Sequence, residues 1–194
     1  SAGADIAFVT TAGGAPGPDF LRSFFGLGLG ESQELLMNCC SLDQATLRAL
    51  GDEVLGFHSV SNWAEGRDSD VVREFNEAYS DKFEGKIPSL NVAGGYMTAS
   101  LVASVIEENG YLTGAELVEA ISSITIEDSI LGKVTFDDYH NLIAPVYIRE
   151  VTKHDDGKLY NTPIETFEAV DQWLGRSPEE ALAQPNYSQD FQGN

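Results

Sequence analysis

The first third of the chain alternates short apolar runs with segments whose apolar residues fall on one side of a helix. The runs at 6–10, 35–38 and 54–60 are rich in β-forming residues and predict strands. Segments 19–25 and 43–50 predict helices, and a glycine follows each of them. This alternation is typical of a parallel sheet, in which ligands bind beyond the carboxyl ends of the strands.

The middle third has a helical pattern. Segment 70–82 carries apolar residues four apart and charges on the opposite side, which predicts an amphipathic helix. Segment 92–109 is apolar over most of its circumference and is entered through Gly-Gly-Tyr-Met-Thr-Ala, so we expect a core helix there. Thr113, with Glu116 three residues later, predicts a capping box for a third helix.

The last third returns to strands. Three β-forming runs predict strands at 134–136, 145–152 and 158–160. The polar segment 154–157 ends in glycine and predicts an antiparallel hairpin turn. Ser177 precedes a proline and two acids, which predicts a final short helix, whereas residues 185–194 show no periodicity.

Composition limits the possible partners. The chain has 194 residues, 42% of them hydrophobic, which is enough for one large domain or two small lobes. It carries 31 acidic and 11 basic residues and a net charge of -20, which would repel a phosphate backbone, so nucleic acid is not expected as a partner. Solvation of the surface, or a saline habitat, accounts for the acidity.

No apolar run in the sequence approaches the about 20 residues that a membrane-spanning helix needs. The first residues lead directly into an apolar run without a basic segment or a cleavage pattern. We therefore expect any export signal to lie outside this sequence.

The two cysteines, Cys39 and Cys40, are adjacent. They are interpreted either as two small thiols at a strand end or as a strained vicinal disulfide in an oxidising compartment. No Cys or His spacing supports zinc, so neither a metal nor a cofactor is expected.

Seven segments of the chain, in this order, resemble the C-terminal half of the type I periplasmic binding proteins, the leucine/isoleucine/valine-binding family of ABC importers. They are Ala-Asp-Ile-Ala-Phe at 4–8, Leu-Gly-Leu at 27–29, Val-Leu-Gly at 54–56, Phe-Asn-Glu-Ala-Tyr at 75–79, Gly-Tyr-Met-Thr-Ala at 95–99, Leu-Gly-Lys-Val-Thr-Phe-Asp at 131–137 followed by His140, and Pro-Asn-Tyr-Ser-Gln-Asp-Phe at 185–191. The resemblance implies an α/β fold with three layers, a parallel sheet with flanking helices, and two lobes that close over a small solute.

The resemblance also implies how the chain is divided. Residues 1–62 would form an α/β segment of the second lobe, 63–137 a helical segment that returns to the first lobe, 138–175 the antiparallel strands of the second lobe, and 176–194 a C-terminal helix and tail. Family members are roughly twice as long, so we expect only the C-terminal half, with an incomplete first lobe. The apolar faces of these helices would lack the sheet on which they normally pack. They would need another protein surface to bury them, which predicts a homodimer, strand exchange or association with the missing N-terminal half.

The resemblance places candidate ligand-binding residues in the loops after the first two strands. Thr11, Gly13 and Gly14 lie in the first loop, where the glycine amides can approach a solute closely. Leucine-binding members carry an aromatic residue here and an acid in the next loop, where this chain has Gly13 and Cys40 or Ser41. Since the anchor for an amino group is not evident, an aliphatic amino acid is disfavoured, and neutral, amide-like or aromatic-acid solutes stay open.

Two further candidates lie outside these loops. Asn62 stands where the chain would cross between the lobes, beside Ser61 and Trp63, and is either a residue of the cleft rim or part of a strand cap. Tyr96 begins the long helix and is either a residue of the cleft or an ordinary core tyrosine.

Catalysis is not expected. The histidines, His58, His140 and His154, share no spacing with a nucleophile. The Gly-x-Gly at 26–28 follows a helix instead of a strand and does not fit a phosphate-binding loop. The resemblance implies an extracytoplasmic or periplasmic receptor for an amino acid, amide or aromatic acid that docks on an ABC permease. The alternative is a ligand-sensing regulatory protein of the same fold, similar to the amide sensors.

Overall fold

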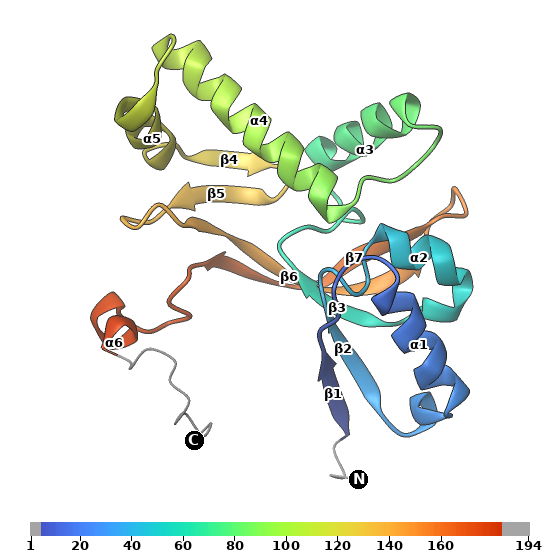
Figure 1. Cartoon of the computed structure of the whole chain (residues 1–194). Helices are drawn as coiled ribbons and strands as arrows, with labels where there is room; N and C mark the ends of the chain where they lie inside the picture. Colours follow the sequence, from blue (N-terminus) through green and yellow to red (C-terminus); the bar gives the residue numbers. More distant parts are fainter. Residues whose placement is uncertain (1–4, 184–194) are drawn as a thin grey trace.

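The computed structural model describes residues 5–183, which form one mixed sheet of seven strands with helices around it (Figure 1). The strands are β1 (Ile6–Val9), β2 (Glu34–Asn38), β3 (His58–Ser61), β4 (Ile126–Ser129), β5 (Gly132–Phe136), β6 (Leu142–Lys153) and β7 (Leu159–Val170). The helices are α1 (Pro16–Gly26), α2 (Gln44–Leu50), α3 (Asp70–Lys82), α4 (Leu90–Asn109), α5 (Gly114–Ser122) and α6 (Pro178–Leu182), with 3-10 turns η1 (Leu29–Glu31) and η2 (Gly51–Val54). None of the described helices is both long and apolar enough to cross a membrane.

The first three strands are parallel, as predicted. In their register Val9 stands opposite Met37, and Asn38 stands opposite Val60. From β3 onward the pairing is antiparallel, with the strand order β1-β2-β3-β6-β5-β4 and β7 paired with β6. The alternation of strands and helices thus produces the predicted α/β fold class, in a sheet that is parallel only in its first part.

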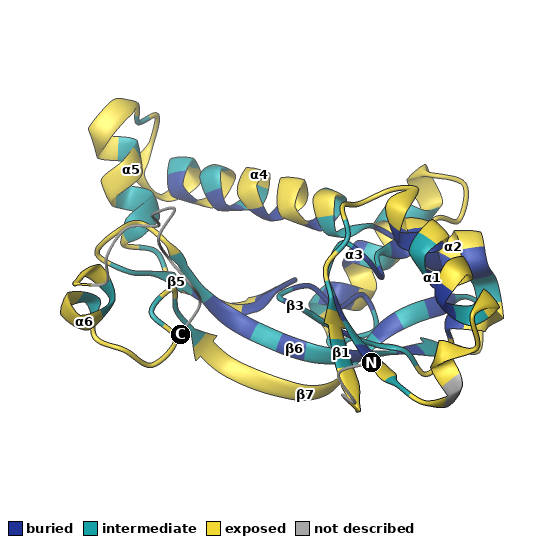
Figure 2. Cartoon of the chain, turned by 60° about the horizontal axis from the view of Figure 1, so that its bottom comes forward, coloured by how far each residue is buried: buried dark blue, intermediate teal, exposed yellow. Residues whose placement is uncertain are grey.

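Two hydrophobic clusters are joined by β6. One contains Leu21, Met37 and Val151, where α1 and α2 cover the parallel strands. The other contains Trp63 and Ala144, together with residues of α3, α4 and β5. Figure 2 shows β6 running from one cluster to the other with alternating buried positions. The predicted division into segments at residues 62, 137 and 175 stays a prediction.

Several strand boundaries differ from those predicted. The strand expected at 54–60 begins only at His58, because 51–54 form η2 and Gly56 takes a φ of 79° that a strand does not contain. β4 was not predicted, and β7 continues to Val170, ten residues beyond the expected end at 160. The outer half of β7 is exposed, including the side chains of Ile164 and Phe167, so its strand state depends on backbone pairing with β6.

Local capping signals were confirmed at one helix and wrong at another. Ser177 caps α6 and completes a reciprocal capping box with Glu180. Thr113 stands at the N-cap of α5 in extended conformation, but its side chain makes no capping hydrogen bond, so the capping box predicted with Glu116 does not form. The tail motif at 185–191 lies outside the described residues.

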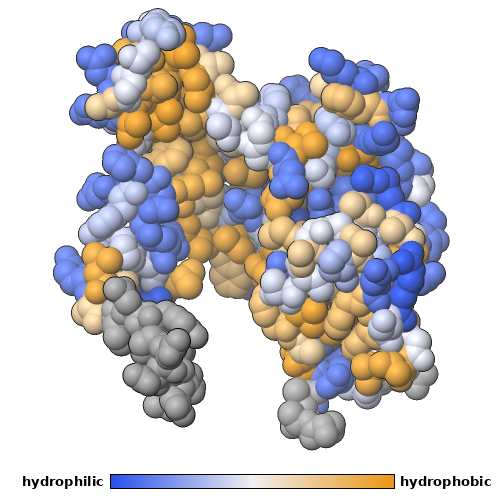
Figure 3. All heavy atoms as spheres, in the orientation of Figure 1, coloured by the Kyte–Doolittle hydropathy of each residue, from blue (hydrophilic) through white to orange (hydrophobic). Residues whose placement is uncertain are grey.

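The long helix α4 is not buried all round, which corrects the expectation of a core helix. Its buried residues lie on one face and are four apart: Ala93, Met97, Leu101 and Val105. Gly94, Thr98 and Ala99 on other faces are exposed. Figure 2 shows buried and exposed stretches alternating along α4. Figure 3 shows hydrophobic surface gathered over α5 and the adjoining end of α4. The sequence is apolar on several faces, and the described chain covers one of them, so the predicted association with another copy or segment stays a prediction.

Two glycine substitutions are expected to change stability in opposite directions. A Cβ on Gly95 in α4 would meet nothing within 4 Å, so Gly95→Ala should add about 0.5–1 kcal/mol to the free energy of unfolding. A Cβ on Gly66 would collide with Thr162 and lie 3.0 Å from the Asn161 carbonyl oxygen, so Gly66→Ala should subtract about 1–3 kcal/mol. Urea denaturation of the two variants checks both signs, and a stabilising Gly66→Ala would contradict the close packing of this segment on β7.

Candidate ligand site

The carboxyl ends of β1 and β2 meet at one edge of the sheet, where Thr11 and Ser41 touch. The two strands are parallel and in register, so the loops that follow them leave side by side. The backbone N–H of Thr11 donates to Ser41 Oγ at 2.9 Å, and the two hydroxyl oxygens lie 2.8 Å apart. The structure thus joins two of the residues that the sequence placed in separate loops.

Asn38, the last residue of β2, holds Ser41 in place. Its Oδ1 accepts from the backbone N–H of Ser41 at 3.0 Å and also from the Ser41 hydroxyl. Since that hydroxyl proton goes to Asn38, the hydroxyl of Thr11 donates to Ser41 Oγ and keeps its own lone pairs free. We refer to Thr11, Asn38 and Ser41 as the edge network. Ser41 positions the loops, and Thr11 keeps acceptor capacity for a ligand.

Gly17, near the start of α1, permits the close approach of the two loops. A Cβ there would lie 2.9 Å from the Ser41 carbonyl oxygen and 3.1 Å from Thr46 Oγ1, so no larger residue fits without displacement. Sequence reasoning missed both Asn38 and Gly17. A polar residue that ends a buried strand and a Gly-Pro pair that opens a helix were the available signals.

Gly13 and Gly14 lie on the open side of the edge network. Both are exposed, and a Cβ on either would meet nothing within 4 Å. Within residues 5–183 neither backbone N–H has a hydrogen-bond acceptor. They precede the N-terminus of α1, an 11-residue helix whose first turn carries partial positive charge. Free amide donors and a helix N-terminus together suit an anionic oxygen.

The remaining predicted residues lie at increasing distance along the chain from the edge network. Cys40 precedes Ser41 and is half-buried. Asn62 follows β3 at the same edge of the sheet and is half-buried, and Ser61 beside it accepts a hydrogen bond from the Trp63 amide. Tyr96 lies on α4 and is 48% exposed. Its ring contacts Phe75 of α3, with centroids 4.4 Å apart, so it packs helix on helix.

One hydrogen bond connects this edge of the sheet with the long helix. Asp43 Oδ1 accepts from the backbone N–H of Leu90, the first residue of α4, at 3.1 Å. Ser89 caps the same helix by accepting from Val92. The segment that follows β2 is thereby connected to the N-terminus of α4.

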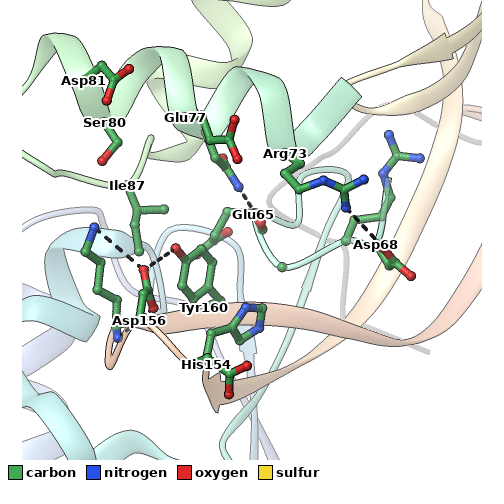
Figure 4. Close-up of a pocket in the computed structure, with 15 residues that line it drawn as sticks. Glu65, Asp68, Arg73, Glu77, Ser80, Asp81, Ile87, His154, Asp156 and Tyr160 are labelled. Carbon is green, nitrogen blue, oxygen red and sulfur yellow. Dashed lines mark hydrogen bonds and ion pairs between the residues drawn. The ribbon is translucent and has the colours of Figure 1, made fainter. Parts of the chain in front are cut away.

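A polar cavity lies elsewhere, between α3 and the β6–β7 hairpin. It measures about 890 Å³ and is lined by polar residues of both elements. Figure 4 shows Glu77, Ser80 and Asp81 of α3 across from Tyr160 and His154 of the hairpin. None of the predicted ligand-binding residues lines it. Size alone does not identify a ligand site, and the edge network has the more specific arrangement of unused donors.

The cavity marks the joint between α3 and the hairpin. Lys158 Nζ donates to the Gly85 carbonyl at 2.7 Å, and Asn76 Nδ2 donates to the Glu65 carbonyl at 2.8 Å. The buried Glu65 carboxylate accepts from Gln44 at 2.6 Å and from the Asn161 side chain at 2.8 Å. These bonds tie the segment after β3 to α2 and β7, so the walls of the cavity are fixed by polar contacts.

The structure brings two histidines to hydroxyl groups, which the sequence spacing did not indicate. His154 Nε2 lies 3.2 Å from Thr162 Oγ1. Ser122 Oγ lies 2.7 Å from His140 Nδ1. The same hydroxyl donates to the Val118 carbonyl at 2.8 Å, so its single proton is already used. His140 Nδ1 must therefore donate to Ser122, which is the reverse of what a general base does. Within the described residues no group of three or more His, Cys, Asp and Glu is arranged to hold a metal ion.

Comparisons with known proteins identify the family. The family described as "Periplasmic binding protein" matches residues 1–158. A protein of Brucella melitensis named Leu/Ile/Val-binding protein homolog 6 is 31% identical over 173 residues, which cover 86% of this chain and 43% of that protein. The Brucella abortus protein of the same name is 32% identical and is covered over 39% of its length. The chain thus spans less than half the length of the curated relatives it matches.

Solved structures agree with this match. A solute-binding protein from Rhodopseudomonas palustris HaA2, solved with p-hydroxybenzoic acid, is 28% identical with a TM-score of 0.77 over 88% of this chain and 47% of that one. An ABC transporter substrate-binding protein from Sphaerobacter thermophilus has a TM-score of 0.79 over 86% of this chain and 46% of that one; at 24% identity this likeness concerns the fold. By sequence, this chain belongs to the periplasmic binding protein family.

Proposed function

We propose that this chain is part of the solute-binding component of an extracytoplasmic ABC importer and that its solute is a small aromatic carboxylate. The edge network with the unused amides of Gly13 and Gly14 supports this proposal most directly. In this reading the solute carboxylate accepts from the two glycine amides near the N-terminus of α1. A ring hydroxyl of the solute can donate to Thr11 Oγ1.

The charges at this edge argue against an amino-acid solute. An ammonium group requires an anionic or strongly accepting partner. Residues 10–14 and 38–42 contain no carboxylate, and the adjacent Asp43 accepts from Leu90. The described edge therefore offers neutral donors, which stabilise a carboxylate but give an ammonium no counter-charge.

The relatives favour the same class of solute. Two solute-binding proteins of Rhodopseudomonas palustris, 28% and 29% identical to this chain, were solved with p-hydroxybenzoic acid and with 3,4-dihydroxybenzoic acid. The curated Brucella relatives carry a Leu/Ile/Val-binding name instead. The absence of a carboxylate from the two loops makes the aromatic acids the better match for this chain.

A thermal-shift series tests the proposal with 4-hydroxybenzoate, benzoate and leucine as probes. A solute at 100 times its dissociation constant stabilises a folded receptor by about 2.7 kcal/mol. We expect 4-hydroxybenzoate to raise the melting temperature and leucine to leave it unchanged. A shift with leucine alone would overturn the choice of solute. If none of the three probes raises the melting temperature of a protein that contains both lobes, the proposal of a receptor for aromatic acids or amino acids is overturned.

Removal of the Ser41 hydroxyl should weaken the binding of the aromatic acid. Ser41→Ala deletes the group that connects the Thr11 backbone, the Thr11 side chain and Asn38. Each lost hydrogen bond is worth about 0.5–1.5 kcal/mol, so the dissociation constant for 4-hydroxybenzoate should rise about tenfold. Isothermal titration calorimetry measures the change.

Ser104→Ala is the matched control for this prediction. Ser104 is exposed on α4, and its hydroxyl donates only to the Ser100 carbonyl of its own helix. The Ser104→Ala variant should therefore leave the affinity for 4-hydroxybenzoate unchanged. Equal effects of the two alanine variants would show that the edge network does not position the solute.

A further inference from the structure

Cys39 and Cys40 occupy the two central positions of the turn that follows β2. The Ser41 amide donates to the Asn38 carbonyl at 3.2 Å, which closes a four-residue turn around them. Both side chains are half-buried and carry free thiols, and their Sγ atoms lie 3.5 Å apart. The two thiols therefore face each other between two members of the edge network.

We propose that Cys39 and Cys40 form a reversible disulfide that changes the geometry of the edge network, with a small-molecule disulfide as the oxidant. One cysteine thiolate attacks a sulfur of the small disulfide and releases one thiolate. The second cysteine then attacks the mixed disulfide and releases the other. The cysteines together lose two electrons and two protons, and the small disulfide becomes two thiols.

The bond between these neighbours is expected to be easily reversed. Consecutive Cα atoms across a trans peptide are about 3.8 Å apart, whereas disulfides usually join Cα atoms about 4.4–6.8 Å apart. The eight-membered ring is therefore strained, and strain makes a disulfide more reducible. Strained and accessible disulfides are the labile and regulatory ones, in contrast to structural cross-links.

Closure of the ring must alter the edge network. The Sγ atoms have to approach from 3.5 Å to a bond length of about 2 Å, which requires new backbone and side-chain torsions at Cys39 and Cys40. Asn38 and Ser41 are the residues on either side of them. The hydrogen bond between Ser41 and Asn38 spans this turn, and Thr11 bonds to the same Ser41, so the new torsions displace both contacts.

The surroundings of Cys39 do not hold its thiol in the thiolate state. Burial and the neighbouring Cys40 raise the pKa of Cys39, and the positive charge of Arg149 opposes this rise. Cys39 is therefore protonated at neutral pH.

Intact-mass measurement tests the disulfide itself. The purified chain is equilibrated with oxidised and reduced glutathione at a series of ratios, and we expect a monomer that has lost two hydrogen atoms and regains them on reduction. Unchanged free thiols at every ratio, a persistent glutathione adduct, or a covalent dimer on a non-reducing gel would overturn the proposal.

Hydrogen exchange tests the effect on the edge network without any solute. The Thr11 amide donates to Ser41 Oγ at 2.9 Å, so its protection reports on this contact. We expect faster exchange in the peptide that contains Thr11 when the disulfide is closed. Identical exchange in the oxidised and reduced chains would overturn the claim that the bond changes the edge.

The consequence for solute binding rests on the proposed function. Coupling between two sites typically changes affinity by about fivefold or more, so the oxidised and reduced chains should differ at least to that extent in their dissociation constants for 4-hydroxybenzoate. The double variant Cys39→Ser with Cys40→Ser should give the same affinity in oxidising and reducing buffer. If neither form binds the probe, the proposed function fails, while mass and hydrogen exchange still decide whether the disulfide forms. If the oxidised and reduced wild-type chains bind 4-hydroxybenzoate with equal affinity, the claim that the disulfide controls binding is overturned.

Discussion

Arg149→Met should lower the free energy of unfolding by about 3–5 kcal/mol, because it removes one member of a buried polar cluster. Arg149 lies on β6 opposite Ser59 of β3 and is 1% exposed. Its guanidinium donates twice to Ser59 Oγ, at 2.9 and 3.1 Å, and to the Trp63 carbonyl at 2.6 Å. Methionine fills a similar volume but leaves these acceptors unpaired in the interior.

The charge of Arg149 also stabilises the joint between β3, β6 and the following segment. Burial lowers the pKa of Arg149, and the carboxylate of Glu65 is the strongest of the groups that raise it again. Guanidinium groups nevertheless stay protonated in proteins, so the positive charge persists. Loss of that charge leaves the buried Glu65 without its electrostatic partner, which adds to the cost of the lost hydrogen bonds.

Chemical denaturation of the 194-residue chain and its variants measures the effect. Arg73→Met is the matched control, since Arg73 is half-exposed and pairs only with surface aspartates, and it should cost about 0–1 kcal/mol. Arg149→Lys keeps the positive charge but loses the planar set of guanidinium donors. Its loss in the free energy of unfolding should therefore lie between those of Arg149→Met and Arg73→Met. A loss at Arg149→Met no greater than at Arg73→Met would contradict the buried cluster.

Trp63→Ala should lower the free energy of unfolding by about 3–5 kcal/mol through the void that it leaves. Trp63 is 0% exposed and packs edge-on against Phe75 of α3, with ring centroids 5.8 Å apart. It belongs to the cluster that contains Ala93 and Met97 of α4. The indole thus connects the end of the parallel strands with both long helices.

Trp63→Phe separates packing from the polar part of the indole. The indole Nε1 is buried and has no hydrogen-bond partner among the described residues. Phenylalanine keeps much of the ring contact and removes this unsatisfied donor, so its cost should be well below that of alanine. Tyr111→Ala, at a side chain 84% exposed, should stay within about 0.5 kcal/mol of the wild type. Equal losses for the alanine and phenylalanine variants at Trp63 would contradict the packing argument.

Elements with a strong local pattern were predicted with little error. The bounds predicted for α3, 70–82, are those observed, since its apolar spacing lies within a single helix. The turn at 154–157 has Gly157 at a φ of 77°, as its composition indicated. β7 could not be predicted in full because its outer half has no buried face of its own, and pairing with β6 holds it.

The candidate site was predicted only in outline. The alternation of strands and helices placed Thr11 and Ser41 at one edge of a sheet, but their hydrogen bond and the role of Asn38 depend on the register of β1 with β2. Arg149 was not singled out, because a single basic residue within an alternating strand is normally solvent-facing. Its burial follows from its position opposite Ser59, on a strand that is covered at that point.

The sequence by itself determined the class of fold and the family, since these depend on local periodicity and on motif order, and it predicted the edge of the sheet at which a ligand would bind. The tertiary structure decided which polar groups meet there, which face of α4 is buried and which charge lies in the interior. Contacts between residues far apart in the chain carry no local pattern, because their energy comes from the register and packing of elements that the sequence specifies separately.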